Sequence, residues 1–206
     1  MAFESFREFL KQLDNAGELR RLDVPVATEL EITELADREM KKPGGGQALL
    51  FENPTLNGNP TDIPLAINTM GSQKRMAMML DRDSVDEAAT ELGKLMQAKP
   101  PTSFRETISL LGTALELRHA KPKKVKNGPC KEVIIKGDDL KDTRTGLPTL
   151  LNLPIQQCWP QDAGRFITLP CVVTQDPDSG ARNLGIYRMQ VFDNQTTGMH
   201  WQLQKV

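Results

Sequence analysis

The hydrophobic pattern of this 206-residue chain changes near its middle, which limits the fold to two differently built parts. In the first part, apolar residues recur at three- and four-residue spacing, the period of a helix with one buried face. From about Lys131 onward they alternate or cluster in short runs between turn residues, a pattern typical of strands. We therefore predict an α/β (α+β) fold, with a small N-terminal α/β domain followed by a β-rich domain.

Helices and short strands share the first part of the predicted fold. One helix is indicated by apolar residues on a single face, ending before Gly17: Phe3, Phe6, Phe9, Leu10 and Leu13. Thr28 with Glu31, and Ser84 with Glu87, form capping-box patterns that predict helices to about Lys41 and Met96. The remaining predicted elements are strands at 19–24, 48–51 and 64–67 and a helix at 72–80.

Three consecutive glycines, Gly44 to Gly46, follow Pro43. They lack the Gly-Lys-Ser/Thr ending and the GxGxxG spacing of phosphate-binding loops. We interpret them as a helix C-cap and flexible turn. Gly71-Ser72, before the next predicted helix, is a weak signal for an anion at a helix N-terminus.

Proline and lysine mark the joint between the two parts. Pro100-Pro101 is followed by a predicted helix at 103–117 and by a lysine-rich segment at 121–129. That segment has no aromatic residues for base stacking, so a solvated linker is favoured over a nucleic-acid patch. The predicted organisation is a domain at 1–99, a helix and basic linker at 100–128, and a second domain at 129–206.

Composition excludes several classes of protein. The formal net charge is -1, which gives no overall field for nucleic acid or a membrane surface. No apolar run approaches the roughly 20 residues needed to cross a bilayer, and the N-terminus lacks the pattern of a signal peptide. We expect a cytoplasmic protein. The odd, widely spaced Cys130, Cys158 and Cys171 indicate reduced thiols, buried as small hydrophobic groups.

The second domain is predicted to be built partly from hairpins. Its strands are expected at 133–135, at 165–175 with an interruption at Pro170, at 183–192, and from Met199 onward. In the 183–192 strand, Arg188 shares a face with apolar neighbours and therefore needs an anionic partner. That partner is either a carboxylate side chain, which sequence physics slightly favours, or a bound phosphate or carboxylate.

The sequence resembles the UbiD family of decarboxylases over essentially its whole length. The resemblance is carried by Asp162-Ala163-Gly164-Arg165-Phe166-Ile167-Thr168 and by Arg182-Asn183-Leu184-Gly185-Ile186-Tyr187-Arg188-Met189-Gln190-Val191. Matching pieces in the first part are Glu31-Ile32-Thr33-Glu34-Leu35-Ala36-Asp37-Arg38, Ala48-Leu49-Leu50-Phe51-Glu52-Asn53-Pro54 and Lys74-Arg75-Met76-Ala77. The resemblance implies that the second domain is the start of a split β-barrel that binds flavin.

The resemblance also implies chemistry and site residues. The family removes CO2 from aromatic or α,β-unsaturated carboxylic acids, including polyprenyl-hydroxybenzoate precursors of quinones. It uses prenylated FMN, a divalent metal (Mn2+ or Mg2+) and often K+. Asn183 matches a metal ligand, and Arg188 also matches the arginine that orients the substrate carboxylate. The positions matching cofactor contacts are Ile186, Tyr187, Arg188, His200, Trp201, Gln202 and Lys205.

Two departures from the family pattern bear on function. Gln204 stands where many members have a histidine ligand, and an amide oxygen is a weaker ligand than imidazole. Members continue well past the position of Val206, with the metal-binding glutamate, the catalytic acid and a dimerisation domain. We therefore expect the 206 residues alone to be inactive, and the intact enzyme to be a homo-oligomer.

Its expected partner is a small aromatic carboxylic acid, with no nucleic acid. No transmembrane segment is expected, although a lipid-like substrate would allow peripheral contact with a membrane. The competing hypotheses are a flavin-phosphate-binding or interaction module without independent catalysis, and a structural domain without a ligand.

Overall fold

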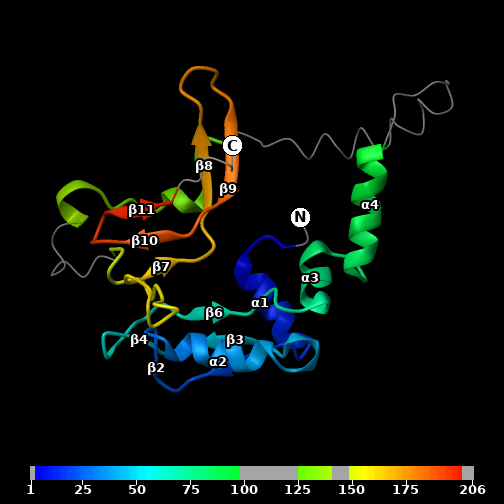
Figure 1. Cartoon of the computed structure of the whole chain (residues 1–206), viewed down its shortest axis with the longest axis horizontal. Helices are drawn as coiled ribbons and strands as arrows, with labels where there is room; N and C mark the ends of the chain where they lie inside the picture. Colours follow the sequence, from blue (N-terminus) through cyan, green and yellow to red (C-terminus); the bar gives the residue numbers. More distant parts are fainter. Residues whose placement is uncertain (1–2, 98–124, 141–148, 201–206) are drawn as a thin grey trace.

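The computed structural model describes residues 3–97, 125–140 and 149–200. Its mixed helices and sheets confirm the predicted α+β class (Figure 1). The predicted helix at 103–117 and most of the basic linker lie outside the described residues, as do Trp201, Gln202, Gln204 and Lys205.

The first part is built around one fully buried strand. Strands β1 (Leu19–Leu22), β3 (Ala48–Phe51) and β6 (Leu65–Ile67) form a sheet with β3 in the middle, parallel to β1 and antiparallel to β6. Because side chains alternate across a strand, Ala48 and Leu50 pack in one core cluster with Phe9 and Leu13 of α1 (Phe6–Asn15). Leu49 and Phe51 pack on the opposite side with Ile32 of α2 (Glu31–Met40).

The starts of the helices test the predicted caps. The Ser84 hydroxyl accepts the backbone N–H of Glu87 at 3.1 Å, as predicted for the start of α4 (Val85–Gln97). Thr28 does not cap α2: its side chain is fully buried and its hydroxyl donates to the carbonyl of Thr55 at 2.9 Å. Glu31 accepts the N–H of Ala27 at 2.7 Å, and the Thr28 N–H donates to the Thr55 carbonyl at 2.9 Å, so the box predicted from Thr28 and Glu31 does not form.

The remaining elements of the first part are short. A second small sheet consists of β2 (Val26–Ala27), β4 (Pro54–Leu56) and β5 (Asn59–Pro60), with β4 in the middle. Helix α3 (Gln73–Leu80) follows β6 and contacts α4. The Ser72 hydroxyl accepts the backbone N–H of Arg75 at 3.1 Å, so this residue caps α3 itself.

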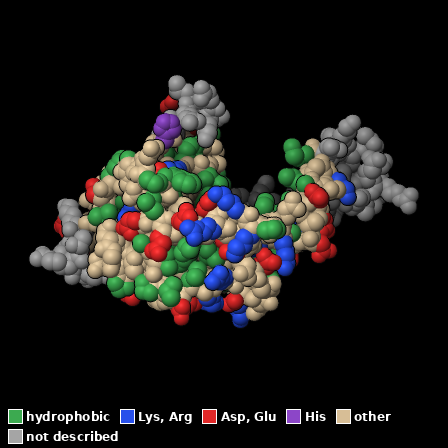
Figure 2. All heavy atoms as spheres, turned by 60° about the horizontal axis from the view of Figure 1, so that its bottom comes forward, with side chains coloured by type: hydrophobic (Ala, Val, Ile, Leu, Met, Phe, Trp, Pro, Cys, Tyr) green, Lys and Arg blue, Asp and Glu red, His purple; other side chains and the backbone are tan. Residues whose placement is uncertain are grey.

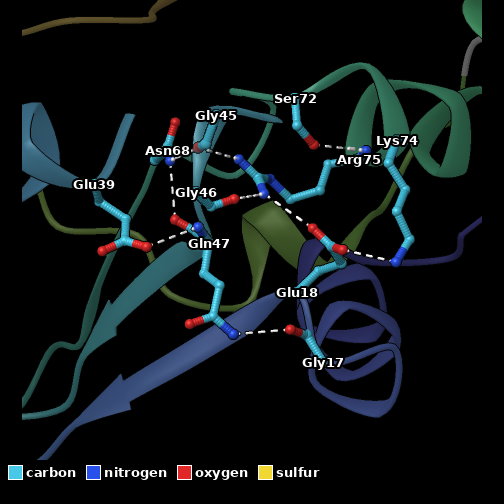
Figure 3. A network of polar contacts seen from close by, with 10 residues as sticks. All are labelled: Gly17, Glu18, Glu39, Gly45, Gly46, Gln47, Asn68, Ser72, Lys74 and Arg75. Atoms are coloured by element: carbon cyan, nitrogen blue, oxygen red, sulfur yellow. Dashed lines mark hydrogen bonds and ion pairs between the residues drawn. The ribbon is translucent and has the colours of Figure 1, made fainter. Parts of the chain in front are cut away.

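The glycine segment is a turn held by a buried arginine. Arg75 of α3 is completely buried and donates to the carbonyls of Gly45 and Gly46 and to Glu18 (Figure 3). The 3-10 turn η1 (Pro43–Gly45) therefore presents carbonyl oxygens to a cation. This confirms the predicted turn and argues against a phosphate loop, which would present N–H groups to an anion. The predicted glycine C-cap is wrong, because α2 ends at a C-cap on Lys41.

The predicted strand at 133–135 is wrong. The structure has two 3-10 turns on either side of this segment, η3 (Pro129–Lys131) and η4 (Gly137–Leu140). Val133 and Ile134 are 73% and 67% exposed, and neither pairs with a strand in the part of the chain that the structure describes. A run of β-branched residues has strand propensity, but it becomes a strand when a partner strand lies beside it.

The predicted continuous strand at 183–192 is instead two strands in two sheets. β9 (Arg182–Ile186) pairs with β8 (Cys171–Gln175), whereas β10 (Met189–Val191) pairs with β7 (Phe166–Ile167) and β11 (Thr197–Met199). Between the two paired regions, residues 168–170 lie opposite residues 187–188, so one side has an extra residue. Pro170 lacks the N–H needed to continue the ladder. The chain therefore turns a corner, and hairpin β8–β9 rises from the other sheet (Figure 1).

The cysteines are free, as expected, but the expectation that they are buried is wrong for all three. Cys130 and Cys171 are exposed, and Cys158 is half-buried. In the described ranges, no helix has the length and apolarity needed to cross a membrane. Acidic side chains lie among the basic ones on the face shown in Figure 2, in keeping with the near-balanced charge.

Candidate functional site at the sheet corner

Arg188 lies at the corner where the chain passes from β9 to β10. Its Nη1 donates to Oδ1 of Asp162 at 2.9 Å, and its Nη2 donates to Oδ2 at 2.5 Å. This is a bidentate ion pair, the strongest geometry between a guanidinium and a carboxylate. The anionic partner that the sequence required is therefore a side chain in this structure, and the Arg188 side chain remains 38% exposed.

Asp162 is fixed by its own loop. Its side chain is 10% exposed, and Oδ2 also accepts the backbone N–H of Trp159 at 3.1 Å. The Asp162 N–H donates back to the Trp159 carbonyl at 3.1 Å, which closes the turn. Hydrogen bonds from Arg188 lower the pKa of Asp162, and the same bonds raise the pKa of Arg188. Both groups therefore stay charged near neutral pH.

The Phe166 ring also contacts the Arg188 guanidinium. The central carbon of the guanidinium lies 3.9 Å from the centre of the ring, a cation–π contact with one face of the group. The guanidinium is thus held at one end by a carboxylate and on one face by a ring.

The strand register brings His200 toward Arg188. Met189 of β10 pairs with Met199 of β11, so Arg188 and His200 each stand one residue beyond this pair at the same end. His200 is exposed. Two of the predicted cofactor-contacting segments therefore approach each other at the corner, although the sequence separates them by a turn.

Asn183 lies on the adjoining hairpin, opposite Thr174 of β8. Its amide Nδ2 lies 3.5 Å from the hydroxyl of Tyr187. A side chain at Gly185 would place its Cβ 2.5 Å from the Tyr187 ring, so the glycine makes room for this tyrosine. By strand alternation Asn183 and Gly185 share one face, and the Ile186 side chain, 66% exposed, lies on the other.

Asn183 is the one predicted metal ligand that lies among the described residues. The Asn183 amide nitrogen is turned to Tyr187, which leaves the carbonyl oxygen as a donor suited to a hard divalent cation. In the ranges that the structure describes, no three His, Cys, Asp or Glu side chains gather in a metal-binding group. Asn183 fits as one ligand of such a cation, and further donors would have to come from elsewhere.

Arg165 ties this corner to the first part of the molecule. Its guanidinium donates to the hydroxyl of Thr28 at 2.8 Å, to the carbonyl of Ile155 at 2.5 Å, to Asn57 at 3.2 Å and to the carboxylate of Glu29. Burial lowers the pKa of Arg165, whose side chain is 14% exposed. The Asp162 loop is therefore held by Arg188 and also, through Arg165, by Thr28 and Glu29 of the first part.

Sequence reasoning missed Asp162, Phe166 and Arg165 as parts of the site. All three stand in a segment that carries the family resemblance, but the spacing of residues in the sequence does not predict which side chains they contact. A signal existed for Asp162, because an arginine among apolar neighbours demands an anion and this carboxylate precedes a predicted neighbouring strand.

The fold is that of a two-part α+β protein, in which Arg188 lies fixed and partly exposed where β9 passes into β10. The chain belongs to the UbiD family. Residues 10–96 match the 3-octaprenyl-4-hydroxybenzoate carboxy-lyase N-terminal domain, and residues 122–206 match the Rift-related domain of the same carboxy-lyase. An uncharacterized protein of Archaeoglobus fulgidus is 42% identical over 205 residues, which cover 100% of this chain and 39% of that relative. One of Aquifex aeolicus is 41% identical over 98% of this chain and 39% of its own length.

Solved structures give the same family. The UbiD-class enzyme HmfF from Pelotomaculum thermopropionicum, in an evolved dimeric form with prenylated FMN, matches with a TM-score of 0.69 and 26% identity over 98% of this chain and 39% of its own. Vanillic acid decarboxylase from Sedimentibacter hydroxybenzoicus matches with the same score and identity over 96% and 36%. The chain thus spans about two fifths of the length of these relatives, whose family consists of carboxy-lyases.

Proposed function

We propose that this chain is the N-terminal portion of a larger enzyme that decarboxylates an aromatic or α,β-unsaturated carboxylic acid, of the quinone-precursor type such as polyprenyl-hydroxybenzoate. The carrying observation is Arg188, ordered and part-exposed at the sheet corner of a chain that matches both UbiD family models. An arginine with unused N–H groups is suited to a carboxylate.

Each predicted site residue has a role in this proposal. Arg188 binds and orients the substrate carboxylate, and Asn183 offers an amide oxygen to a divalent metal, Mn2+ or Mg2+. Tyr187, Arg188 and His200 line one side of the cofactor, together with Ile186 through its position in the strand. Trp201, Gln202, Lys205 and the second metal position, Gln204, belong to the proposal on sequence alone. Prenylated FMN supplies the electron sink for loss of CO2 when bound.

The domain limits and the assembly are proposals of the same kind. The family matches at 10–96 and 122–206 support domains at 1–99 and 129–206 joined by a linker at 100–128. We propose a homo-oligomeric enzyme in the cytoplasm, with K+ as a further ion, and with peripheral membrane contact where the substrate is lipid-like.

The test uses the full protein produced in cells that supply prenylated FMN. Metal and flavin content are measured first, followed by CO2 release from a panel of hydroxybenzoates, prenylated hydroxybenzoates and cinnamates. We expect turnover of at least one acid and its loss in Arg188→Met. Turnover that is unchanged in Arg188→Met would contradict the assigned role. We also expect no turnover from the 206 residues alone.

A second candidate is a flavin-phosphate-binding module without independent catalysis. The observation that favours it is that the Arg188 charge is already balanced by Asp162, at a corner where two segments predicted to contact the cofactor approach each other. Stoichiometric binding of FMN by the full protein, with no CO2 release from any acid in the panel, would favour this module over the decarboxylase.

A further inference from the structure

The Arg188 guanidinium has more hydrogen-bonding capacity than its ion pair uses. The group carries five N–H donors, and the bonds to Asp162 take one from each Nη. We propose that Asp162 and Phe166 are positioning residues that hold Arg188 so that its remaining N–H groups face a carboxylate ligand. This rests on the proposed function, because it deepens the role of Arg188 there.

Charge alone does not explain Asp162. A carboxylate next to Arg188 offsets the positive charge that would attract an anionic ligand, so its presence lowers the Coulombic attraction for that ligand. Asp162 does, however, fix the plane of the guanidinium, because both Nη atoms bond to the two oxygens of one carboxylate. The benefit of the pair to binding is therefore geometric, since less conformational freedom is lost when the ligand arrives.

Asp162 is itself a rigid support. The Trp159 N–H bonds to its Oδ2, and the Gln157 side chain donates to its carbonyl at 3.4 Å. Gln190 of β10 donates to the carbonyl of Ala163 at 3.0 Å, which joins the loop to the strand that follows Arg188. The support and the arginine thus belong to one connected piece, and the loop cannot shift without breaking these bonds.

Phe166 restricts the direction of approach. Its ring covers one face of the guanidinium at 3.9 Å, and β7 pairs directly with β10. Asp162 occupies one end of the guanidinium and Phe166 covers one face, so a carboxylate ligand can approach along the remaining N–H edge. Hydrogen bonds from a guanidinium to a carboxylate lie in the guanidinium plane, so this edge is the side that can bind the ligand.

The test is benzoate affinity in the full protein loaded with FMN rather than prenylated FMN, so that binding is measured without turnover. Asp162→Asn keeps the shape of the side chain and removes its charge. We expect about tenfold weaker benzoate binding by calorimetry, because Arg188 loses its fixed orientation. A purely electrostatic role predicts the opposite sign, since removal of a negative charge favours an anion. Equal or tighter binding in Asp162→Asn would therefore overturn the proposal.

Matched variants separate position from charge. Asp178→Asn, in the exposed turn of hairpin β8–β9, removes the same charge away from Arg188 and should leave benzoate affinity unchanged. Asp162→Glu restores the charge and should bind more tightly than Asp162→Asn. Phe166→Leu should weaken binding by about threefold through loss of the cation–π contact. With prenylated FMN and an accepted acid, Asp162→Asn should lower kcat as well as raise KM.

A second readout covers the case in which the wild-type protein binds no benzoate, which would count against the proposed function. Crystal structures of Asp162→Asn and Asp178→Asn then decide the positioning role by themselves. Displacement or disorder of the Arg188 guanidinium in Asp162→Asn, with an unchanged Arg188 in Asp178→Asn, supports it. An Arg188 that keeps its place without the Asp162 charge refutes it.

Discussion

The two parts of the molecule each contain an arginine paired with a carboxylate, but they use the pair differently. Arg75 is fully buried and donates to Glu18 and to the carbonyls of Gly45 and Gly46 (Figure 3). Arg188 is 38% exposed, and both of its Nη atoms donate hydrogen bonds to Asp162. The first pair is directed inward to close a turn. The second leaves donors available at the surface.

The surroundings follow the same division. Among the described residues, every buried hydrophobic residue except Val191 lies between Phe9 and Ala77. In hairpin β8–β9, by contrast, Val173, Leu184 and Ile186 are each about two-thirds exposed. The first part thus has its own core, whereas the second presents strands and polar groups on open surfaces. The buried Arg75 pair in the first part therefore maintains the fold, whereas Arg188 at the corner of the second part keeps donors at the surface.

The largest expected effect on folding comes from Arg75→Met. The change leaves Glu18 and two backbone carbonyls without their buried donor, and removal of one partner from a buried ion pair costs about 3 kcal/mol. We expect the free energy of unfolding in urea to fall by that amount. Arg38→Met is the matched control, because Arg38 is 72% exposed in its pair with Glu34 and should cost about 0.3 kcal/mol. Equal losses in the two variants would contradict the comparison.

The first part was predicted from sequence more accurately than the second, for a physical reason. Helix α1 and the buried strand β3 follow from local periodicity and from a short apolar run, signals that each segment carries itself. The break at Tyr187-Arg188 depends on which partner strand lies beside each half, and Pro170 sits on that partner. Such a non-local contact has no periodicity of its own.

The candidate site was predicted by resemblance and only partly by physics. The demand of Arg188 for an anion follows from strand burial, and a carboxylate partner was the favoured alternative. That the partner is Asp162 required the loop geometry, since the two residues are 26 positions apart. The roles of Asn183 and His200 have no signal in composition or spacing, and remain proposals.

Arg165→Met tests the connection between the two parts. We expect a loss of about 2 kcal/mol, because Glu29 and Thr28 lose a shared, largely buried donor. Hydrogen exchange should rise at Leu30 and Gln157, whose backbone groups bond across the same junction. Exposed Arg7→Met is the control and should change neither quantity. Unchanged exchange at Leu30 in Arg165→Met would show that the junction does not depend on this side chain.

Acid should weaken the buried pair by a smaller amount. Bonds from Lys74 and Arg75 lower the pKa of Glu18 below its ordinary value of 4.5. A carboxylate with a lowered pKa in the folded state stabilises the protein above its unfolded pKa, and this contribution is lost as pH falls through the folded pKa. Urea unfolding between pH 5 and 3 should therefore have a shallower pH dependence in Glu18→Gln than in the wild type. Parallel curves would remove Glu18 from the acid response.

Arg188→Met should have a small effect on folding and the clearest effect on function. A partly exposed pair contributes about 0.5 kcal/mol to stability, so the urea midpoint should barely move. The same change removes the donors that the proposal assigns to the ligand carboxylate, and decarboxylation by the full protein with prenylated FMN should fall by about a hundredfold or more. Arg182→Met on the exposed strand β9 controls for loss of charge and should retain activity. A large loss of stability in Arg188→Met, matching that of Arg75→Met, would show that both arginines hold the fold, because a side chain reserved for a ligand contributes little before the ligand binds.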